Sequence, residues 1–145
     1  MGPIRVKKLR ENAVLPTYGS AEAAGADLYA CLDEEFVIQP GKTAFIPTGL
    51  AMELPKGFTG LICARSGLAC KRGLAPANKV GVIDSDYRGE FLVALHNHGD
   101  TPQTISVGER IAQLLVVPVL TPAFAECEAL DETDRASGGF GSTGK

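Results

Sequence analysis

The sequence has no apolar run long enough to cross a bilayer, and its four cysteines form no Cys-x-x-Cys pair. A membrane-spanning helix needs about 20 consecutive apolar residues, and a zinc site needs Cys or His ligands at short, fixed spacings. Cys31, Cys63, Cys70 and Cys127 are instead far apart. We therefore expect no membrane span and no zinc centre, and we interpret the cysteines as free, buried thiols in a reducing compartment.

A strong excess of charge of either sign is also lacking, because 14 Lys and Arg residues face 17 Asp and Glu residues, for a net charge of -3. Such a chain offers no general electrostatic reason to bind duplex nucleic acid or an anionic membrane. The first residues have neither the apolar core nor the cleavage site of a signal peptide. We expect a cytoplasmic protein, with the nucleus as a second location if the source is eukaryotic.

Glycine and proline, at 17 and 9 residues, divide the 145-residue chain into short segments. Short apolar segments bounded by such turn signals are typical of all-β sandwiches and barrels. We predict a single all-β domain, a jelly-roll-like β-barrel over residues 1–130, followed by a mobile glycine-rich arm over residues 131–145. The predicted strands cover residues 4–9, 26–31, 36–38, 43–47, 50–54, 60–64, 80–83, 91–97, 103–107, 111–118 and 123–127.

Three groups of polar residues interrupt these apolar segments. Asp27 lies in a glycine-flanked strand start, where a turn carboxylate bonded to its own backbone is the simpler interpretation. Arg65 and Ser66 follow an apolar strand, and Ser66 is expected to cap a short helix over residues 66–71. Asp84 and Tyr87 lie in a predicted hairpin loop. The preceding Val-Ile pair is expected to desolvate Asp84 in part, as a general base requires.

Five blocks in this order resemble the trimeric deoxyuridine triphosphate nucleotidohydrolase (dUTPase) family. The blocks are Ala24-Gly-Ala-Asp-Leu28, Arg65-Ser-Gly-Leu-Ala69, Asn78-x-x-Gly-Val-Ile-Asp-Ser-Asp-Tyr-Arg-Gly89, Gly108-Glu-Arg-Ile-Ala-Gln-Leu114 and Gly138-Gly-Phe-Gly-Ser-Thr-Gly144. Each block alone is weak evidence, but five in order with fitting intervals are specific. The resemblance implies hydrolysis of dUTP to dUMP and pyrophosphate, which keeps uracil out of DNA and supplies dUMP.

The resemblance also implies roles for individual residues. Asp84 would activate the water that attacks the α-phosphorus, and Asp27 would hold a Mg²⁺ cofactor through water, on the triphosphate. The ring of Tyr87 would lie against the deoxyribose and exclude a 2′-hydroxyl. The remaining substrate-binding residues are Arg65, Ser66, Gly67 and Gln113 for the phosphates; Asn78, Gly81, Val82 and Ile83 for the uracil edge; Phe140 over the uracil; and Arg135, Gly141, Ser142 and Thr143 in the arm, where Arg135, Ser142 and Thr143 would grip the γ-phosphate.

The family further implies a homotrimer whose three active sites are shared between chains. Two positions depart from the family pattern: Ala136 stands where glycine is common, and Ala64 stands where proline is usual. If residue 136 needs a positive φ, the arm would close with some strain. We expect these departures to alter arm dynamics or affinity and to leave the chemistry intact.

Two other functions fit the sequence less well. A dCTP deaminase of the same fold would carry a different loop after the Ile-Asp pair and would lack the tail motif. A non-catalytic trimeric β-barrel interaction module would not need Asp27, Asp84, Gln113 and Arg135 together. Release of ammonia from dCTP would favour the first alternative over the dUTPase.

Overall fold

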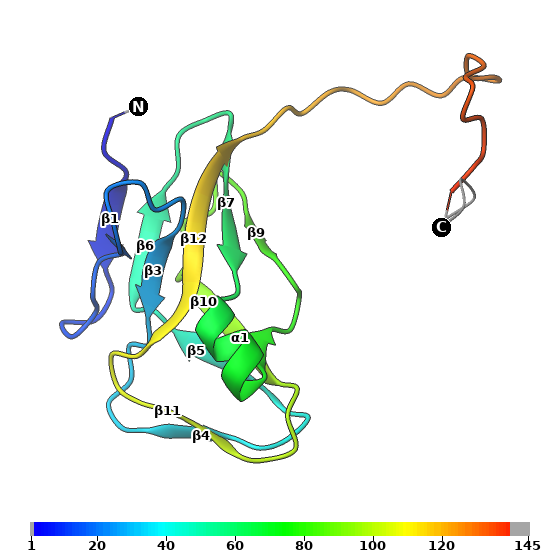
Figure 1. The fold of residues 1–145 in the computed structure, drawn as a ribbon. Coiled ribbons are helices and arrows are strands. Elements are labelled where there is room, and N and C mark those ends of the chain that lie inside the picture. The colour runs from blue at the N-terminus through cyan, green and yellow to red at the C-terminus, as the bar shows by residue number, and fades with distance from the viewer. Residues whose placement is uncertain (1, 140–145) are drawn as a thin grey trace.

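A computed structural model describes residues 2–139 of the chain, and within them the structure is nearly all strand and loop. Figure 1 shows the strands wrapped around one core, with the short helix at one end. The elements are β1 (Arg5–Lys8), β2 (Thr17–Tyr18), β3 (Ala26–Tyr29), β4 (Phe36–Ile38), β5 (Thr43–Pro47), β6 (Leu50–Glu53), β7 (Phe58–Cys63), α1 (Ser66–Arg72), β8 (Leu74–Pro76), β9 (Gly81–Ile83), β10 (Leu92–Asn97), β11 (Gln103–Ile105) and β12 (Arg110–Pro118).

These strands form four sheets in the described part of the chain. The largest has the order β2-β3-β12-β7-β9, a second has the order β5-β10-β8, and the pairs β1-β6 and β11-β4 form two small ribbons. The all-β class is confirmed. None of the four sheets closes on itself, so "barrel" describes the arrangement only loosely.

The hydrophobic core lies between the two larger sheets. In β10 the burial alternates along the strand, so that Val93 and Leu95 point inward while Leu92 is exposed. This is the period-two pattern of a strand with one covered face. Leu28 of β3 and Ile111 of β12 fill the opposite side and are likewise almost fully buried.

Most predicted strands are found within two or three residues of their expected bounds, but some predictions are wrong. Residues 123–127 form no strand in the described structure, and β2 and β8 were not predicted. β8 ends in Pro76, which argues against a strand in sequence, yet β8 is an edge strand of its sheet and an edge tolerates proline.

The cysteines are all free, but only Cys31 is buried, while Cys63 is half-buried and Cys70 and Cys127 are exposed. The expectation of four buried thiols is therefore wrong for the other three. Burial raises the pKa of the Cys31 thiol, and its Sγ donates a hydrogen bond to Asn12 Oδ1 at 3.1 Å. No helix in residues 2–139 is long and apolar enough to cross a bilayer.

Helix α1 is anchored by Arg72 to β11 and to the turn before β12. The Arg72 guanidinium donates to Gln103 Oε1 at 3.0 Å, to the carboxylate of Glu109 and to the carbonyl of Thr104. Glu109 also accepts a hydrogen bond from the Ser106 backbone N–H at 2.9 Å. At the C-terminal end of α1, Gly73 adopts φ +64, the left-handed conformation that glycine tolerates best. The helix is thus held at its C-terminal end by both backbone and side chain.

Replacement of Arg72 by alanine should destabilise the fold by about 1.5–3 kcal/mol, because it leaves the Glu109 carboxylate, whose side chain is only 20% exposed, without its guanidinium donor. Arg5→Ala is the matched control, since the Arg5–Glu53 pair has side chains that are 80% and 40% exposed. Such an exposed pair contributes less than about 1 kcal/mol. Urea unfolding at one fixed protein concentration measures both variants, and equal losses would contradict the anchoring role of Arg72.

Candidate active site

The antiparallel register of the five-stranded sheet places polar residues from distant parts of the chain in one row. Gln113 of β12 lies opposite Asp27 of β3 and opposite Cys63 of β7. Directly paired residues in antiparallel strands share a face of the sheet. Arg65 also lies close to this row in the chain, because β7 ends at Cys63 and Ala64 and Arg65 follow directly.

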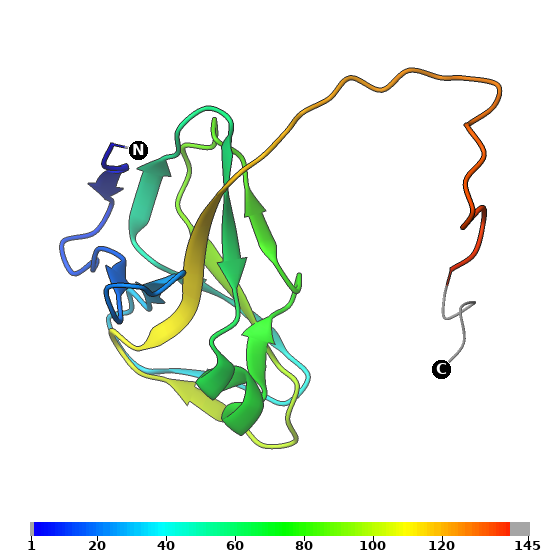
Figure 2. The same cartoon turned by 45° about the horizontal axis from the view of Figure 1, so that its top comes forward.

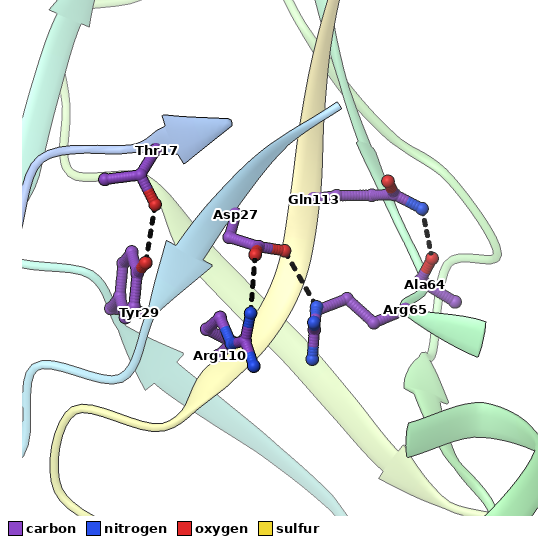
Figure 3. A network of polar contacts seen from close by, with 7 residues as sticks. All are labelled: Thr17, Asp27, Tyr29, Ala64, Arg65, Arg110 and Gln113. Atoms are coloured by element: carbon purple, nitrogen blue, oxygen red, sulfur yellow. Dashed lines mark hydrogen bonds and ion pairs between the residues drawn. The ribbon is translucent and has the colours of Figure 1, made fainter. Parts of the chain in front are cut away.

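Asp27 is bound by two arginines, as Figure 3 shows. Arg65 Nε lies 2.8 Å from Asp27 Oδ1, and Arg110 Nη1 lies 3.3 Å from Asp27 Oδ2. The Asp27 side chain is only 13% exposed, which strengthens these interactions relative to a surface pair. Two guanidinium groups against one carboxylate leave an excess of positive charge at this point. The interpretation of Asp27 as a turn carboxylate bonded to its own backbone is wrong, because Asp27 lies within β3 and its oxygens accept from two arginines.

Gln113 ties this row to the loop before the helix. Its Nε2 donates to the carbonyl of Ala64 at 2.9 Å. On its other side, a Cβ added at Gly25 would lie 2.4 Å from Gln113 Oε1. Only glycine permits the backbone of residue 25 to approach the carboxamide so closely. The polar Gln113, unexpected within an apolar strand, is thus held in one orientation.

Sequence reasoning assigned no role to Arg110 and did not find the Thr17–Tyr29 pair. Thr17 lies opposite Asp27 in the register, and its hydroxyl lies 2.6 Å from that of Tyr29. Arg110 reaches Asp27 because the register of β12 against β3 shifts between residues 110 and 112. The position of Arg110, a charged residue at the start of an apolar strand and three residues before Gln113, was the sequence signal for a role in the site. The bulge that redirects it was not visible in the sequence.

The first two residues of α1 are presented to solvent. Ser66 and Gly67 are exposed, and a Cβ on Gly67 would meet no atom within 4 Å. The predicted N-cap is wrong, because Arg65 occupies that position in an extended conformation and no side chain caps the helix. Ser66 instead opens the helix, and its side chain is exposed.

The second group of predicted residues lies in another part of the sheet. The hairpin expected around Asp84 is wrong: β9 pairs with β7, while β10 pairs with β5 and β8, so the loop joins two sheets. The expected burial of Asp84 is also wrong for the single chain, since Asp84 is exposed and Val82 is 64% exposed. The reason is that β9 is an edge strand with no neighbour on its outer side. Asp84 faces a cavity of about 980 Å³, which is lined by neither Asp27, Arg65 nor Gln113.

The two groups cannot meet within one chain. Ile83 pairs with Gly60, three residues along β7 from Cys63, which marks the row of Asp27 and Gln113. At the usual strand dimensions, Ile83 lies roughly 10 Å from this row along the strands. Across the strands it lies two spacings, roughly 10 Å, from Gln113 and three spacings, roughly 14 Å, from Asp27. Asp84 lies one residue beyond Ile83. A single chain therefore holds two incomplete halves of the predicted site.

The third part of the predicted site is the C-terminal segment, which leaves the body after β12. Residues 119–139 extend away from the sheets in both views (Figures 1 and 2). Leu120 and Phe124 are 90% and 98% exposed. Within this segment, Arg135 Nε donates to the Gly138 carbonyl at 2.9 Å. Ala136, which stands where the family commonly has glycine, adopts φ +46, in the left-handed region that favours glycine. Phe140, Gly141, Ser142 and Thr143 lie outside the described residues.

The donor groups present fit a hydrated Mg²⁺ better than a protein cage. Residues 2–139 contain no group of three or more His, Cys, Asp or Glu side chains placed to hold a metal. Asp27 is a single carboxylate whose two oxygens each accept one bond from an arginine. An ionised carboxylate has about four lone-pair sites, so capacity remains for water. Mg²⁺ commonly keeps several waters and binds through one or two carboxylates and substrate phosphates.

Fold and site together define a class of protein: an all-β domain that gathers arginines, a carboxylate and a carboxamide at strand ends, a donor set suited to a polyphosphate. The family follows from comparison with known proteins. The sequence model of the dUTPase family matches residues 11–144, and the chain belongs to this family. As a member of this family, the chain is an enzyme of the dUTP diphosphatase class.

Individual relatives agree over nearly the whole chain. The deoxyuridine 5′-triphosphate nucleotidohydrolase of Syntrophotalea carbinolica is 50% identical over 141 residues, 97% of this chain and 96% of that protein. The enzyme of Desulfitobacterium hafniense is 56% identical over 131 residues, 90% of this chain and 87% of that protein. Among solved structures, a dUTPase variant from Staphylococcus bacteriophage 80alpha with dUpNHpp superposes with a TM-score of 0.91 at 29% identity, covering both chains completely.

Gly25→Ala should lower kcat/KM for dUTP by about tenfold or more, because the new methyl group displaces the Gln113 carboxamide by up to an ångström. Gly19→Ala is the control, since a Cβ there would meet no atom within 4 Å. Steady-state hydrolysis and thermal unfolding of both variants provide the measurement. A Gly25→Ala enzyme with unchanged kinetics would show that the close approach to Gln113 does not matter for turnover.

Proposed function

We propose that the chain hydrolyses dUTP to dUMP and pyrophosphate by attack of water on the α-phosphorus, and so removes dUTP and supplies dUMP. Family membership and the likeness to a dUTPase bound to dUpNHpp support the substrate. The observation that carries the proposal is the convergence of Arg65 and Arg110 on the shielded Asp27, in a chain whose net charge is negative. Positive charge concentrated at one point of such a chain suits a triphosphate.

The phosphate chain is bound by Arg65, which precedes α1, and by the first turn of α1. Arg65 supplies a guanidinium fork, while Ser66 and Gly67 offer an exposed hydroxyl and an open backbone. Gln113 lies beside this segment through its bond to the Ala64 carbonyl and contacts the phosphates near the α position. In the arm, Arg135, Ser142 and Thr143 bind the γ-phosphate, and Phe140 covers the uracil.

Asp27 holds the Mg²⁺ of the substrate complex through water. The bound Mg²⁺ supplies neutralisation of the triphosphate charge. Arg65 and Arg110 fix the orientation of the Asp27 carboxylate, because each donates to a different oxygen.

Asp84 is the general base. Its carboxylate accepts a proton from water as the water oxygen forms a bond to the α-phosphorus. The bond between the α-phosphorus and the bridging oxygen breaks, and pyrophosphate leaves with that electron pair. Asp84 is exposed in the single chain, which leaves its carboxylate accessible to groups brought by another chain.

Base and sugar are recognised by the segment around β9. A Cβ at Gly81 would lie 3.4 Å from Asn78 Nδ2, so the Asn78 carboxamide lies beside the backbone of Gly81. Asn78 and the backbone of Gly81, Val82 and Ile83 read the hydrogen-bonding edge of the uracil. The Tyr87 ring, 43% exposed, lies against the deoxyribose and leaves no room for a 2′-hydroxyl.

A homotrimer completes the sites. One chain contributes Asp27, Arg65 and Gln113, a neighbour contributes Asp84 and Tyr87, and the third contributes the arm. The separation of the two groups within one chain supports this arrangement. So does the arm, because apolar side chains as exposed as Leu120, Phe124 and Leu130 mark a surface that another chain covers.

Pyrophosphate release from dUTP, dCTP, dTTP and UTP, each with and without Mg²⁺, tests the reaction. We expect kcat/KM for dUTP to exceed that for UTP by about 100-fold or more, because the Tyr87 ring rejects the 2′-hydroxyl sterically. Turnover should fall without Mg²⁺, and Asp84→Asn should lose at least about 100-fold in kcat. Ammonia release from dCTP would indicate a deaminase, and no turnover of any nucleotide would indicate a non-catalytic module.

Sharing of sites is tested by mixing an Asp84→Asn chain with a chain truncated after residue 130. Random assembly should restore about one quarter of wild-type activity, because half of the sites receive an intact base and half of those an intact arm. Differently tagged chains allow mixed trimers to be purified before the assay, and this purified sample should show about one third of wild-type activity, because each mixed trimer has one complete site in three. A mixture of Asp84→Asn with a chain carrying both changes is the control and should stay inactive. An inactive mixture of verified mixed trimers would contradict shared sites.

A further inference from the structure

The loop between β9 and β10 contains a contact that explains how Tyr87 is oriented. A Cβ added at Gly89 would lie 2.4 Å from the Tyr87 hydroxyl oxygen, 2.6 Å from Cζ and 2.9 Å from Cε2. Real Cβ atoms essentially never approach other atoms closer than 3.0 Å. The Tyr87 ring therefore rests directly on the α-carbon of Gly89, in a space that any side chain would fill.

The same end of the ring is also held by a hydrogen bond, and the Tyr87 backbone is held by another. The Tyr87 hydroxyl donates to the Glu90 carbonyl at 3.0 Å, and the Tyr87 backbone N–H donates to the Asp84 carbonyl at 3.1 Å. On its inner side the ring lies near Phe91, with centroids 6.2 Å apart and planes inclined by 36°. Asp84 and Tyr87 are thus parts of one turn.

The residues that follow Gly89 are fixed to the core. Glu90 accepts a hydrogen bond from the Gly49 backbone N–H at 2.8 Å. Phe91 is completely buried, its N–H donates to the Leu50 carbonyl at 2.8 Å, and its carbonyl accepts from the Thr48 hydroxyl at 2.7 Å. Because the backbone that follows Gly89 is fixed, a clash between a side chain at residue 89 and the Tyr87 ring cannot be relieved by a shift of the loop. The ring itself must move.

We propose that Gly89 is a positioning residue that sets the discrimination between deoxyribose and ribose by fixing the position of the Tyr87 ring. The inference rests on the proposed contact of Tyr87 with the sugar. An alanine at residue 89 must push the ring away by about 1 Å, since 2.4 Å falls short of the ordinary contact distance of 3.4 Å by that amount. Displacements of this size alter rates by orders of magnitude when they affect substrate positioning.

The test compares kcat/KM for dUTP and for UTP in four enzymes: wild type, Gly89→Ala, Tyr87→Ala and the double variant. We expect the dUTP-to-UTP ratio to fall about tenfold or more in Gly89→Ala, because a displaced ring no longer matches the deoxyribose. In the Tyr87→Ala background, Gly89→Ala should change the ratio less than about twofold, because a residue that acts through Tyr87 has no effect without it. Gly19→Ala is the control and should keep the wild-type ratio, since its Cβ would meet no atom within 4 Å.

Each other outcome identifies its own failure. An unchanged ratio in Gly89→Ala, with kcat/KM lowered equally for both nucleotides, would overturn the proposal and leave Gly89 with a merely structural role. A lowered ratio that persists in the Tyr87→Ala background would overturn it as well, because Gly89 would then act without the ring. An unchanged ratio in Tyr87→Ala would instead contradict the proposed sugar contact.

A second measurement needs no folded Gly89 variant. If the ring rests on Gly89 in solution, the ring current of Tyr87 must shift the Gly89 α-proton resonances in the NMR spectrum of the wild-type protein. Tyr87→Ala should remove that shift, while Tyr18→Ala, which removes another exposed tyrosine, should leave it. Gly89 α-protons that do not respond to Tyr87→Ala would overturn the proposal.

Discussion

The candidate site depends on one antiparallel register, that of β12 between β3 and β7. It places Gln113 beside Asp27 on one side and beside the start of the Arg65 loop on the other. A slip by one residue would turn Gln113 to the opposite face of the sheet and separate it from the Ala64 carbonyl. The apolar residues that flank Gln113 oppose such a slip, because Ala112 and Leu114 are buried in the core. Core packing and site geometry are therefore set by the same hydrogen-bonded strands.

Electrostatics within this register follow from a bulge and a helix. The shift between residues 110 and 112 directs Arg110 towards Asp27, and the start of α1 brings Arg65 to the other oxygen. The helix is in turn held by Arg72 against Glu109, the residue before Arg110. The neighbouring residues Glu109 and Arg110 therefore link α1, through Arg72, with the Asp27 carboxylate.

Two glycines, Gly25 and Gly89, allow close packing of a neighbouring side chain instead of providing backbone flexibility. Gly25 lies against the Gln113 carboxamide, and Gly89 lies against the Tyr87 ring, in both cases closer than a side chain would allow. Neither residue carries a functional group, so a search for chemistry-bearing side chains passes over both. The positive φ of Ala136 represents the opposite case, a non-glycine residue in a conformation that favours glycine. A sequence motif does not show whether a glycine is needed for close packing or for a positive φ, whereas the interatomic distances and backbone angles do.

The sequence by itself determined the all-β class, the bounds of most strands and, through five ordered blocks, the dUTPase family. Local alternation and turn residues are enough for the class and for the strand bounds, because these patterns lie within short segments of the chain. Tertiary structure alone decided which strands pair, why β9 and β10 form no hairpin, and how Arg110 meets Asp27. It also decided that Asp84 is exposed at a sheet edge and lies away from Asp27. These features arise from contacts between residues tens of positions apart, and no local pattern encodes which distant strand will lie alongside.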